Sequence, residues 1–294
     1  MKRKWIALIA LLQVTLAVNA QQNDWDAVEK VFGKKGTVTS DIFKVTFPRT
    51  DLNVNVADAH IMPGLALTSW VAIMKMNNDG MNMSNKCMMM GDLVLQDKEV
   101  AAAVSQLVAS GLEVTAVHNH LVNETPAIKY IHYYGEGDAV QLAEKIKSVF
   151  AVTGTPLTAA SSQPAIAVDW SKVLAILGNT GKQNGMLLQY GFPRNEKTTD
   201  HGMKMPAAMG MATAINFQMI GNKVAATGDF VLLAAEVNEV VKALTANGIV
   251  VTAVHNHMLF DEPRLFMLHF WGVGNAEDIA KGLKAALIKT NSKQ

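Results

Sequence analysis

One heptapeptide, Val-Thr-Ala-Val-His-Asn-His, occurs twice in this chain of 294 residues. The first copy spans residues 114–120 and the second spans residues 251–257. An identity of this length within one chain indicates a duplicated unit, and a duplication restricts the fold to one that can be built from two similar halves. Both copies of the heptapeptide are therefore expected to occupy the same local structure.

Short matches on either side extend the duplication along most of the chain. They lie 145 residues apart at the start of each copy and 137 apart from residue 85 onward, so loops of different length separate equivalent elements. The matched segments include Asp24-Trp25 with Asp169-Trp170, Phe47-Pro48-Arg49 with Phe192-Pro193-Arg194, and Gly91-Asp92 with Gly228-Asp229. We expect repeat 1 at 24–150 and repeat 2 at 169–290. Residues 151–168, rich in Gly, Pro, Ser and Thr, are expected to link them.

The hydrophobic pattern of repeat 1 predicts a fold of the α+β class. Its core reads as strand, strand, helix, strand, strand, helix, after a short helix and two shorter strands. The predicted elements are a helix at 25–32, strands at 43–47, 53–57, 70–76 and 86–95, a helix at 99–109, strands at 112–120 and 128–134, and a helix capped by Asp138. This order, repeated in the second copy, predicts an antiparallel sheet in each repeat with helices packed on one face. Whether the copies are separate domains or one pseudo-two-fold domain stays open.

The first 20 residues have the pattern of a cleavable signal peptide. Lys2, Arg3 and Lys4 precede an apolar stretch at 6–18 that is too short to span a bilayer, and small residues stand at the end of the segment 18–20. No cysteine is present there for lipid attachment, and an uncleaved anchor is the alternative. We expect a periplasmic or secreted protein with no membrane span after cleavage. A net charge of +1 argues against nucleic acid as a partner, and the single cysteine excludes an internal disulfide.

All eight histidines fall in matched pairs between the copies. The pairs are His60 with His201, His118 with His255, His120 with His257, and His132 with His269. Residues i and i+2 of a strand point to one face, so His118 and His120 are expected to project together. If the following hairpin is centred near residue 125, His132 lies directly opposite His118.

Three converging imidazoles with an open fourth position are a familiar zinc arrangement. His60 and His201 are candidates to complete the site, and so are Glu124 and Asp261 in the loops. Copper is the alternative metal, because the loop from His201 to Met205 combines imidazole with thioethers. The methionines between 74 and 90 are expected to fill core space instead. Asn119 and its counterpart Asn256 should point to the opposite face and be structural.

Two other repeated features allow either a structural or a functional interpretation. Arg49 and Arg194 are candidates for binding an anionic group, although an Arg at a strand end is more often paired or solvated. Asp92 and Asp229, each after a glycine, are candidates for a supporting role near a metal, but we favour a turn. The letters His-Asn-His do not indicate an HNH nuclease, whose name refers to residues spread over a larger unit.

Several segments of repeat 1 resemble the LppY/LpqO family of exported bacterial proteins. These are Phe-Pro-Arg at 47–49, Gly-Asp-Leu-Val-Leu at 91–95, the heptapeptide, and Ile-His-Tyr-Tyr-Gly-Glu-Gly-Asp at 131–138. The resemblance covers nearly the whole chain after residue 20 and implies a duplicated domain and export. Some family members are lipoproteins, but the cysteine needed for that is missing here. The resemblance implies no reaction.

These observations predict an exported metal-binding protein with a His-rich zinc or copper site in each repeat. The first alternative is a metal-dependent hydrolase or lyase, with three His on zinc and Glu124 or Asp261 as general base. The second is a small-anion or carbohydrate-binding module without metal. Retention of all four His in both copies favours a binding function over an enzyme, with a metal ion and a candidate small-molecule ligand as partners. It also favours one symmetric site shared by both copies.

Overall fold

The computed structural model describes residues 25–76, 86–158, 166–178 and 180–294. Each repeat forms one six-stranded antiparallel sheet, and equivalent strands occupy equivalent positions. In repeat 1 the strands are, in sheet order, β1 (Thr37–Thr39), β2 (Ile42–Pro48), β5 (Thr68–Lys75), β6 (Cys87–Gln96), β9 (Ile128–Gly137) and β7 (Glu113–His118). In repeat 2 they are β10 (Lys182–Asn184), β11 (Leu187–Pro193), β14 (Ala212–Ile220), β15 (Lys223–Leu233), β18 (Leu265–Gly274) and β16 (Val250–His255).

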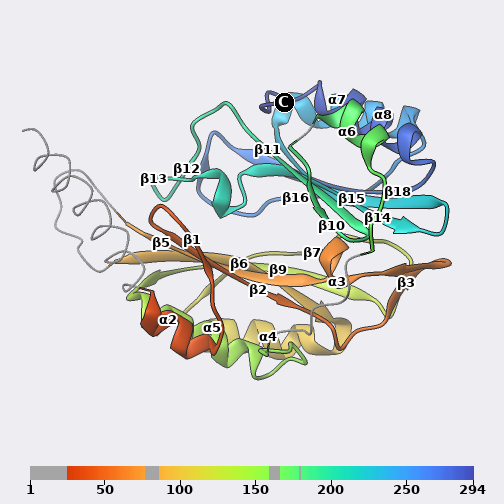
Figure 1. Ribbon diagram of the computed structural model, residues 1–294. Helices are drawn as coiled ribbons and strands as arrows, with labels where there is room; N and C mark the ends of the chain where they lie inside the picture. Colours follow the sequence, from red (N-terminus) through yellow and green to blue (C-terminus); the bar gives the residue numbers. More distant parts are fainter. Residues whose placement is uncertain (1–24, 77–85, 159–165, 179) are drawn as a thin grey trace, which may run out of the picture.

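The longer helices of each repeat cover the outer face of its sheet. Repeat 1 contributes α2 (Asp26–Phe32), α4 (Asp97–Ala109) and α5 (Ala139–Phe150), and repeat 2 contributes α6 (Ser171–Leu177), α7 (Ala234–Ala246) and α8 (Ala276–Leu287). The two sheets face each other, which gives the layer order helix, sheet, sheet, helix (Figure 1). The predicted α+β class, with antiparallel sheets and helices on one face, is confirmed.

The alternation of side chains along the central strands explains the four layers. In β6, Met89 and Leu93 point into the core beneath the helices of repeat 1. Met88 and Met90 point the other way, into a core shared with repeat 2. Because successive residues of a strand face opposite sides, a strand that is apolar at every position needs a partner on both faces. Helices supply one partner and the other repeat supplies the second.

The space between the sheets has an apolar core at each end and a polar region between them. One core is rich in methionine, including Met203 and Met205 of the loop that the sequence favoured for copper. The other contains Val54, Ile61 and Trp271 among others. Ten buried methionines line the first core: Met74, Met76, Met88, Met90, Met203, Met205, Met209, Met211, Met258 and Met267. Unbranched thioether side chains suit a gap of irregular shape between two sheets.

Short segments of each repeat reach across to the other. They belong to two small sheets, β4 (Ala59–Ile61), β3 (Val54–Val56) and β8 (Glu124–Thr125) in repeat 1, and β13 (Met203–Lys204), β12 (Thr199–Asp200) and β17 (Asp261–Glu262) in repeat 2. They are followed by the helical turns α3 (Pro63–Ala66) and η1 (Ala207–Met209). Gln218 donates to the His60 carbonyl at 2.6 Å, and Gln189 donates to the Gly64 carbonyl at 2.9 Å. These bonds hold the repeats together as one body.

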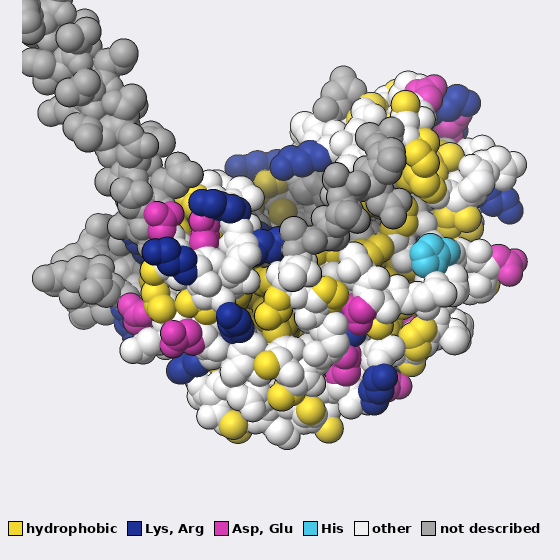
Figure 2. Space-filling model, turned by 60° about the horizontal axis from the view of Figure 1, so that its bottom comes forward, with side chains coloured by type: hydrophobic (Ala, Val, Ile, Leu, Met, Phe, Trp, Pro, Cys, Tyr) yellow, Lys and Arg dark blue, Asp and Glu magenta, His cyan; other side chains and the backbone are white. Residues whose placement is uncertain are grey.

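Some sequence expectations fall outside the described residues. They include the signal peptide at 1–20, the middle of the linker at 159–165, and Met81 and Met83 among the methionines between 74 and 90. Among the helices that the structure describes, none combines the length and apolarity needed to cross a membrane. On the face shown in Figure 2, acidic and basic side chains are interspersed and little histidine is visible.

Gly228 provides a test of how closely the strands approach each other in repeat 2. A Cβ at this position would lie 1.9 Å from the carbonyl oxygen of Ala214. We expect Gly228→Ala to lower the free energy of unfolding by about 2 kcal/mol or more, because backbone would have to move. Gly191→Ala is the matched control, since a Cβ there meets no atom within 4 Å. Urea denaturation measures both, and equal stability of the two variants would contradict the prediction.

Candidate metal centre

The hairpin between β7 and β9 brings the histidines of repeat 1 to the inner face of the sheet. His118 pairs with Tyr130, and Ala116 pairs with His132, past a bulge near residue 115. The predicted register, with His132 directly opposite His118, is therefore wrong by two residues, because the hairpin is centred one residue earlier. The two imidazoles remain diagonal neighbours on one face, with ring centroids 4.9 Å apart. Repeat 2 shows the same register, with Ala253 opposite His269.

Six imidazoles from both repeats form one cluster between the sheets. The rings of His118 and His255 stack across the interface with centroids 3.8 Å apart. The other cross-repeat contacts are related by exchange of the two repeats: His120 with His269 and His132 with His257, each at 3.8 Å. The equality of these two distances shows that the cluster has near-two-fold symmetry.

Hydrogen bonds between the two heptapeptides maintain this arrangement. The Thr115 hydroxyl donates to the carbonyl oxygen of His257 at 2.6 Å, and the Thr252 hydroxyl donates to that of His120 at 2.7 Å. The Asn256 side chain donates to the carbonyls of Thr115 and Met258. The Asn between the two His of repeat 2 therefore orders the backbone across the interface, as a structural residue would.

His132 and His269 each have one ring nitrogen fixed and one left free. Nδ1 of His132 lies 3.1 Å from the Gly91 carbonyl oxygen, and Nδ1 of His269 lies 2.7 Å from that of Gly228. A carbonyl only accepts, so Nδ1 carries the proton and Nε2 presents its lone pair. Metal-ligating histidines are commonly oriented by a backbone carbonyl in this way.

Asp92 and Asp229 face the histidine cluster from the middle of β6 and β15. The turn favoured from sequence for these residues is wrong, because the Gly before each Asp lies within a strand. Gly is needed there because a Cβ at Gly91 would lie 2.2 Å from the Trp70 carbonyl oxygen. Sequence reasoning undervalued this pair, although both copies keep the Asp in an otherwise apolar strand.

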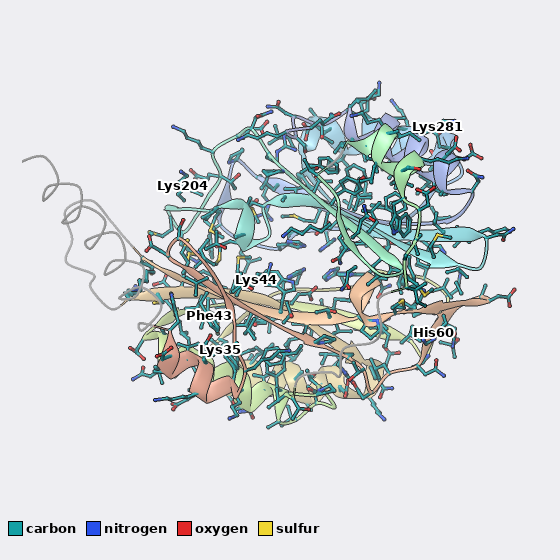
Figure 3. The ribbon with its side chains drawn as sticks, in the orientation of Figure 1. Lys35, Phe43, Lys44, His60, Lys204 and Lys281 are labelled. Carbon is teal, nitrogen blue, oxygen red and sulfur yellow. The ribbon has the colours of Figure 1, made fainter. Side chains whose placement is uncertain are left out.

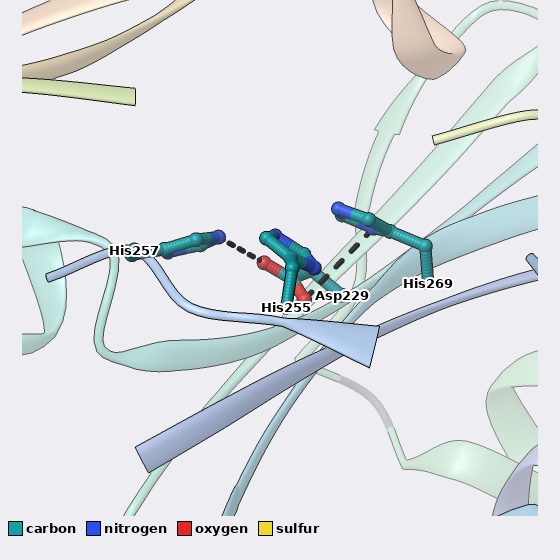
Figure 4. Close-up of side chains that lie close together, drawn as sticks. All are labelled: Asp229, His255, His257 and His269. Carbon is teal, nitrogen blue, oxygen red and sulfur yellow. Dashed lines mark ion pairs between the residues drawn. The ribbon is translucent and has the colours of Figure 1, made fainter. Parts of the chain in front are cut away.

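Each of these carboxylates approaches a histidine without forming a hydrogen bond. Oδ2 of Asp229 lies 3.0 Å from Nε2 of His257, and Oδ2 of Asp92 lies 3.5 Å from Nε2 of His120 (Figure 4 shows the repeat 2 pair). Two ligands of one tetrahedral zinc ion, each about 2.0–2.1 Å from the metal, lie about 3.4 Å apart. The two carboxylate–imidazole separations are therefore close to the separation of two ligands on one ion.

Many polar atoms of the cluster have no hydrogen-bond partner among the described residues. They number nine ring nitrogens, distributed over all six histidines, and one carboxylate oxygen each from Asp92 and Asp229. A buried polar group without a partner costs about 1–3 kcal/mol. Eleven such groups together rival the whole net stability of a typical domain, about 5–15 kcal/mol. The donor atoms therefore fit a ligand that binds several of them at once.

Three groups of these residues have ligand atoms within 4.8 Å of one another, close enough to hold a metal ion. The groups are Asp229, His255, His257 and His269; His118, His120 and His269; and His118, His132 and His255. Two of the three combine residues of both repeats. The sequence predicted one site per repeat, whereas the candidate ligands form one composite centre.

Burial determines the protonation state of the cluster. Desolvation, and then the neighbouring imidazoles, hold the pKa of His118, His120 and His255 far below the usual value. Burial also lowers the pKa of His132 and His269. Burial, and then the nearby Asp229 carboxylate, raise the pKa of Asp92. These five imidazoles are therefore neutral at physiological pH, which is the form that binds metals.

The fourth pair of histidines does not join the cluster. His60 is exposed on β4, where its carbonyl binds Gln218. His201, on the other side of the molecule, stacks on Tyr134 with ring centroids 4.4 Å apart, and its Nδ1 lies 3.1 Å from Asp200. The loops that carry the pair pack against the opposite repeat, which draws both side chains away from the heptapeptides.

The other candidates from the sequence have structural partners. Glu124 accepts from the backbone N–H of Ile128, and Asp261 accepts from that of Leu265. Arg49, fully buried, donates to Asp51, Glu99 and the carbonyl of Val94. Arg194 repeats the pattern with Glu196, Glu236 and the carbonyl of Val231. These guanidinium groups are thus saturated by the chain itself, and neither lies at the cluster.

A family model described as Domain of Unknown Function (DUF1259) matches residues 26–152 and, a second time, residues 171–289. The chain belongs to this family. The duplication that the LppY/LpqO resemblance implied is therefore established, as a pair of DUF1259 domains. The family description names no activity. None of the curated proteins matches the chain.

Three solved structures show a remote likeness to this DUF1259 protein. EtuB from Clostridium kluyveri matches with 9% identity over 75% of this chain and 86% of its own, at a TM-score of 0.21. The regulatory subunit of aspartate kinase from Thermus thermophilus matches with 12% identity over 74% and 96%, also at 0.21. A trimeric bacterial microcompartment shell protein, PduB, matches with 10% identity over 87% and 90%, again at 0.21. Superposition at this level carries no functional argument.

The depressed pKa values predict a specific pH dependence for the metal-free protein. Below about pH 6.5 the histidines of the unfolded chain take up protons that the buried cluster does not accept. Stability should therefore fall as the pH decreases, by up to about 1.4 kcal/mol per pH unit for each excluded proton. Denaturation between about pH 7 and pH 5 measures the slope. His60→Ala, an exposed-site control, should keep the slope, and a flat profile in the wild type would contradict the assignment.

Proposed function

We propose that this protein binds zinc or copper at a composite centre between its two repeats. The observation that supports the proposal most directly is the set of buried ring nitrogens and carboxylate oxygens without hydrogen-bond partners. Three more observations agree with it: the fixed tautomers of His132 and His269, the ligand-like spacing of Asp229 and His257, and the three groups of candidate ligands.

Zinc is the first choice for this donor set. Imidazole with a carboxylate suits zinc, and three or four such ligands complete or nearly complete its tetrahedron. Copper is the alternative, since imidazole also suits Cu(II). The thioethers that favoured copper in the sequence, those of Met203 and Met205, are buried in the methionine-rich core. Binding for storage, delivery or ligand capture is the use that we infer for the metal.

A metal-dependent hydrolase or lyase is the second candidate function. The observation that favours it is a cavity of about 530 Å³ that ends on Asp92, Asp229 and four of the histidines. Glu124 and Asp261, offered as general bases from sequence, are not among the residues that line this cavity. In an enzyme of this architecture, Asp92 and Asp229 at the inner end of the cavity would act as the general bases instead. A metal-free module for anions or carbohydrates has less support, because Arg49 and Arg194 are already paired.

Export and membership of the LppY/LpqO family are part of the proposal. They rest on the amino-terminal pattern of residues 1–20 and on the motif resemblance. A periplasmic or secreted protein that binds zinc or copper would meet its metal outside the cytoplasm.

If the centre is composite, removal of one histidine from either repeat should weaken metal binding at the whole centre. His118→Ala and His255→Ala should each weaken zinc binding by at least about tenfold, because each side chain belongs to two of the candidate groups, at least one of which combines both repeats. Metal content by mass spectrometry and calorimetric titration with zinc measure the effect. His60→Ala is the matched control and should bind as the wild type does.

Two results would contradict this proposal. Protein that takes up neither zinc nor copper would remove its basis. Loss of half the metal in each variant, with the remaining half bound at full affinity, would show two independent sites, one in each repeat.

A further inference from the structure

The cavity beside the histidine cluster is bounded by one row of residues from each sheet. In repeat 1 the row runs across paired strands from Thr46 to Trp70 to Asp92 to His132. In repeat 2 the equivalent row runs from Gly191 to Ala214 to Asp229 to His269. All eight residues line the cavity.

Exposure decreases along both rows. Thr46 and Gly191 are exposed, Trp70 and Ala214 are half-buried, and His132 and His269 are buried. The cavity therefore opens between β2 and β11 and ends at the cluster. Strands lie about 4.8 Å apart, so the path from Thr46 to Asp92 is about 10 Å long.

The two rows are identical at the inner end and differ at the outer end. Both carry Asp followed by His at the cluster, but Thr46 and Trp70 of repeat 1 correspond to Gly191 and Ala214 of repeat 2. Repeat 2 has small residues at these positions and at the neighbouring Ala212. They leave open the space that larger side chains, such as those of Thr46 and Trp70 in repeat 1, would occupy. The cavity thus results from divergence of the repeats in one place while the cluster stays symmetric.

Lys44 gives this cavity a positive charge on one side only. It lies on β2 two residues before Thr46, and its symmetry equivalent is the neutral Gln189. Its ammonium group lies 4.2 Å from the Trp70 ring centroid and 3.4 Å from the Ala208 carbonyl oxygen, between the two sheets (Figure 3). Among the described residues, no carboxylate forms an ion pair with it.

The surroundings of Lys44 favour an anionic partner. Burial lowers the pKa of its ammonium group, so an anion that entered would offset a desolvated charge. A smaller hollow of about 260 Å³ shares Lys44 and Thr46 with the cavity and is also lined by Lys34 and Lys35. Positive charge beside the opening raises the local concentration of anions.

We infer that this cavity binds a small organic carboxylate, with its anionic group on Lys44, its body along Trp70 and its far end at the histidine cluster. The inference deepens the proposed function, since it assigns a ligand class to the same centre. A carboxylate with an aromatic or short-chain body fits a path about 10 Å long that has an indole on one wall and alanine and glycine on the other.

Benzoate and its neutral analogue benzamide test this assignment by calorimetric titration of zinc-loaded and metal-free protein. Wild type should bind benzoate at least about tenfold more tightly than benzamide, because only the carboxylate pairs with the ammonium group. Lys44→Gln, which copies the residue of repeat 2, should remove that preference. Gly191→Leu, which places a side chain in the open space, should weaken both ligands.

Lys281→Gln is the matched control, since it removes an exposed lysine of α8 far from the cavity (Figure 3). It should leave both affinities unchanged. The two proposals fail separately: absence of both zinc and copper uptake, with benzoate binding that still depends on Lys44, overturns the metal centre alone. Normal zinc uptake, with benzoate unbound at millimolar concentration or indifferent to Lys44→Gln, overturns the carboxylate site alone.

Discussion

The packing of one sheet against the other is the constraint on which the rest of this structure depends. Each sheet is apolar on its outer face, where helices cover it, and largely apolar on its inner face, which only the second repeat covers. The duplication is therefore more than a doubling of sites. It supplies the missing half of a core, and it forces the polar residues in the middle of each inner face to meet their own copies.

Contact between the two inner faces buries three histidines of one repeat against three of the other. A single sheet would present three imidazoles to solvent, where they would titrate near their ordinary pKa. Between two sheets they lose water, stay neutral and keep free lone pairs, while Gly91 and Gly228 fix the tautomer of His132 and His269. The same burial would be costly without a ligand, so the fold and the proposed metal depend on each other.

The sequence was informative where the physics is local. Strand alternation, the Asp138 cap of α5 and the periodicity of the helices predict the elements, and the repeated His positions select six of the cluster residues. It was misleading where the outcome depends on the other repeat. Gly-Asp is an ordinary turn signal, and only the sheet-on-sheet packing shows that Asp92 stands in a strand and faces Asp229. His60 shares the repeat pattern of the true cluster, yet its loop serves the interface.

The pattern of divergence between the repeats separates what the fold needs from what a ligand would need. Arg49 with Glu99 and Arg194 with Glu236 form the same ion pair in both halves. The carboxylate of each Glu also accepts a backbone N–H from the segment that follows the last helix, from Gly154 and from Asn291. Such repetition suits a structural role, because each half must solve the same folding problem. The histidines and Asp92 with Asp229 also repeat, as a symmetric centre requires.

Lys44 and Trp70 do not repeat, although their strands do. A residue that the fold needs in one half would be needed in the other, so this asymmetry is best explained by something outside the fold: a ligand that enters from one side and has a charged end and a neutral one.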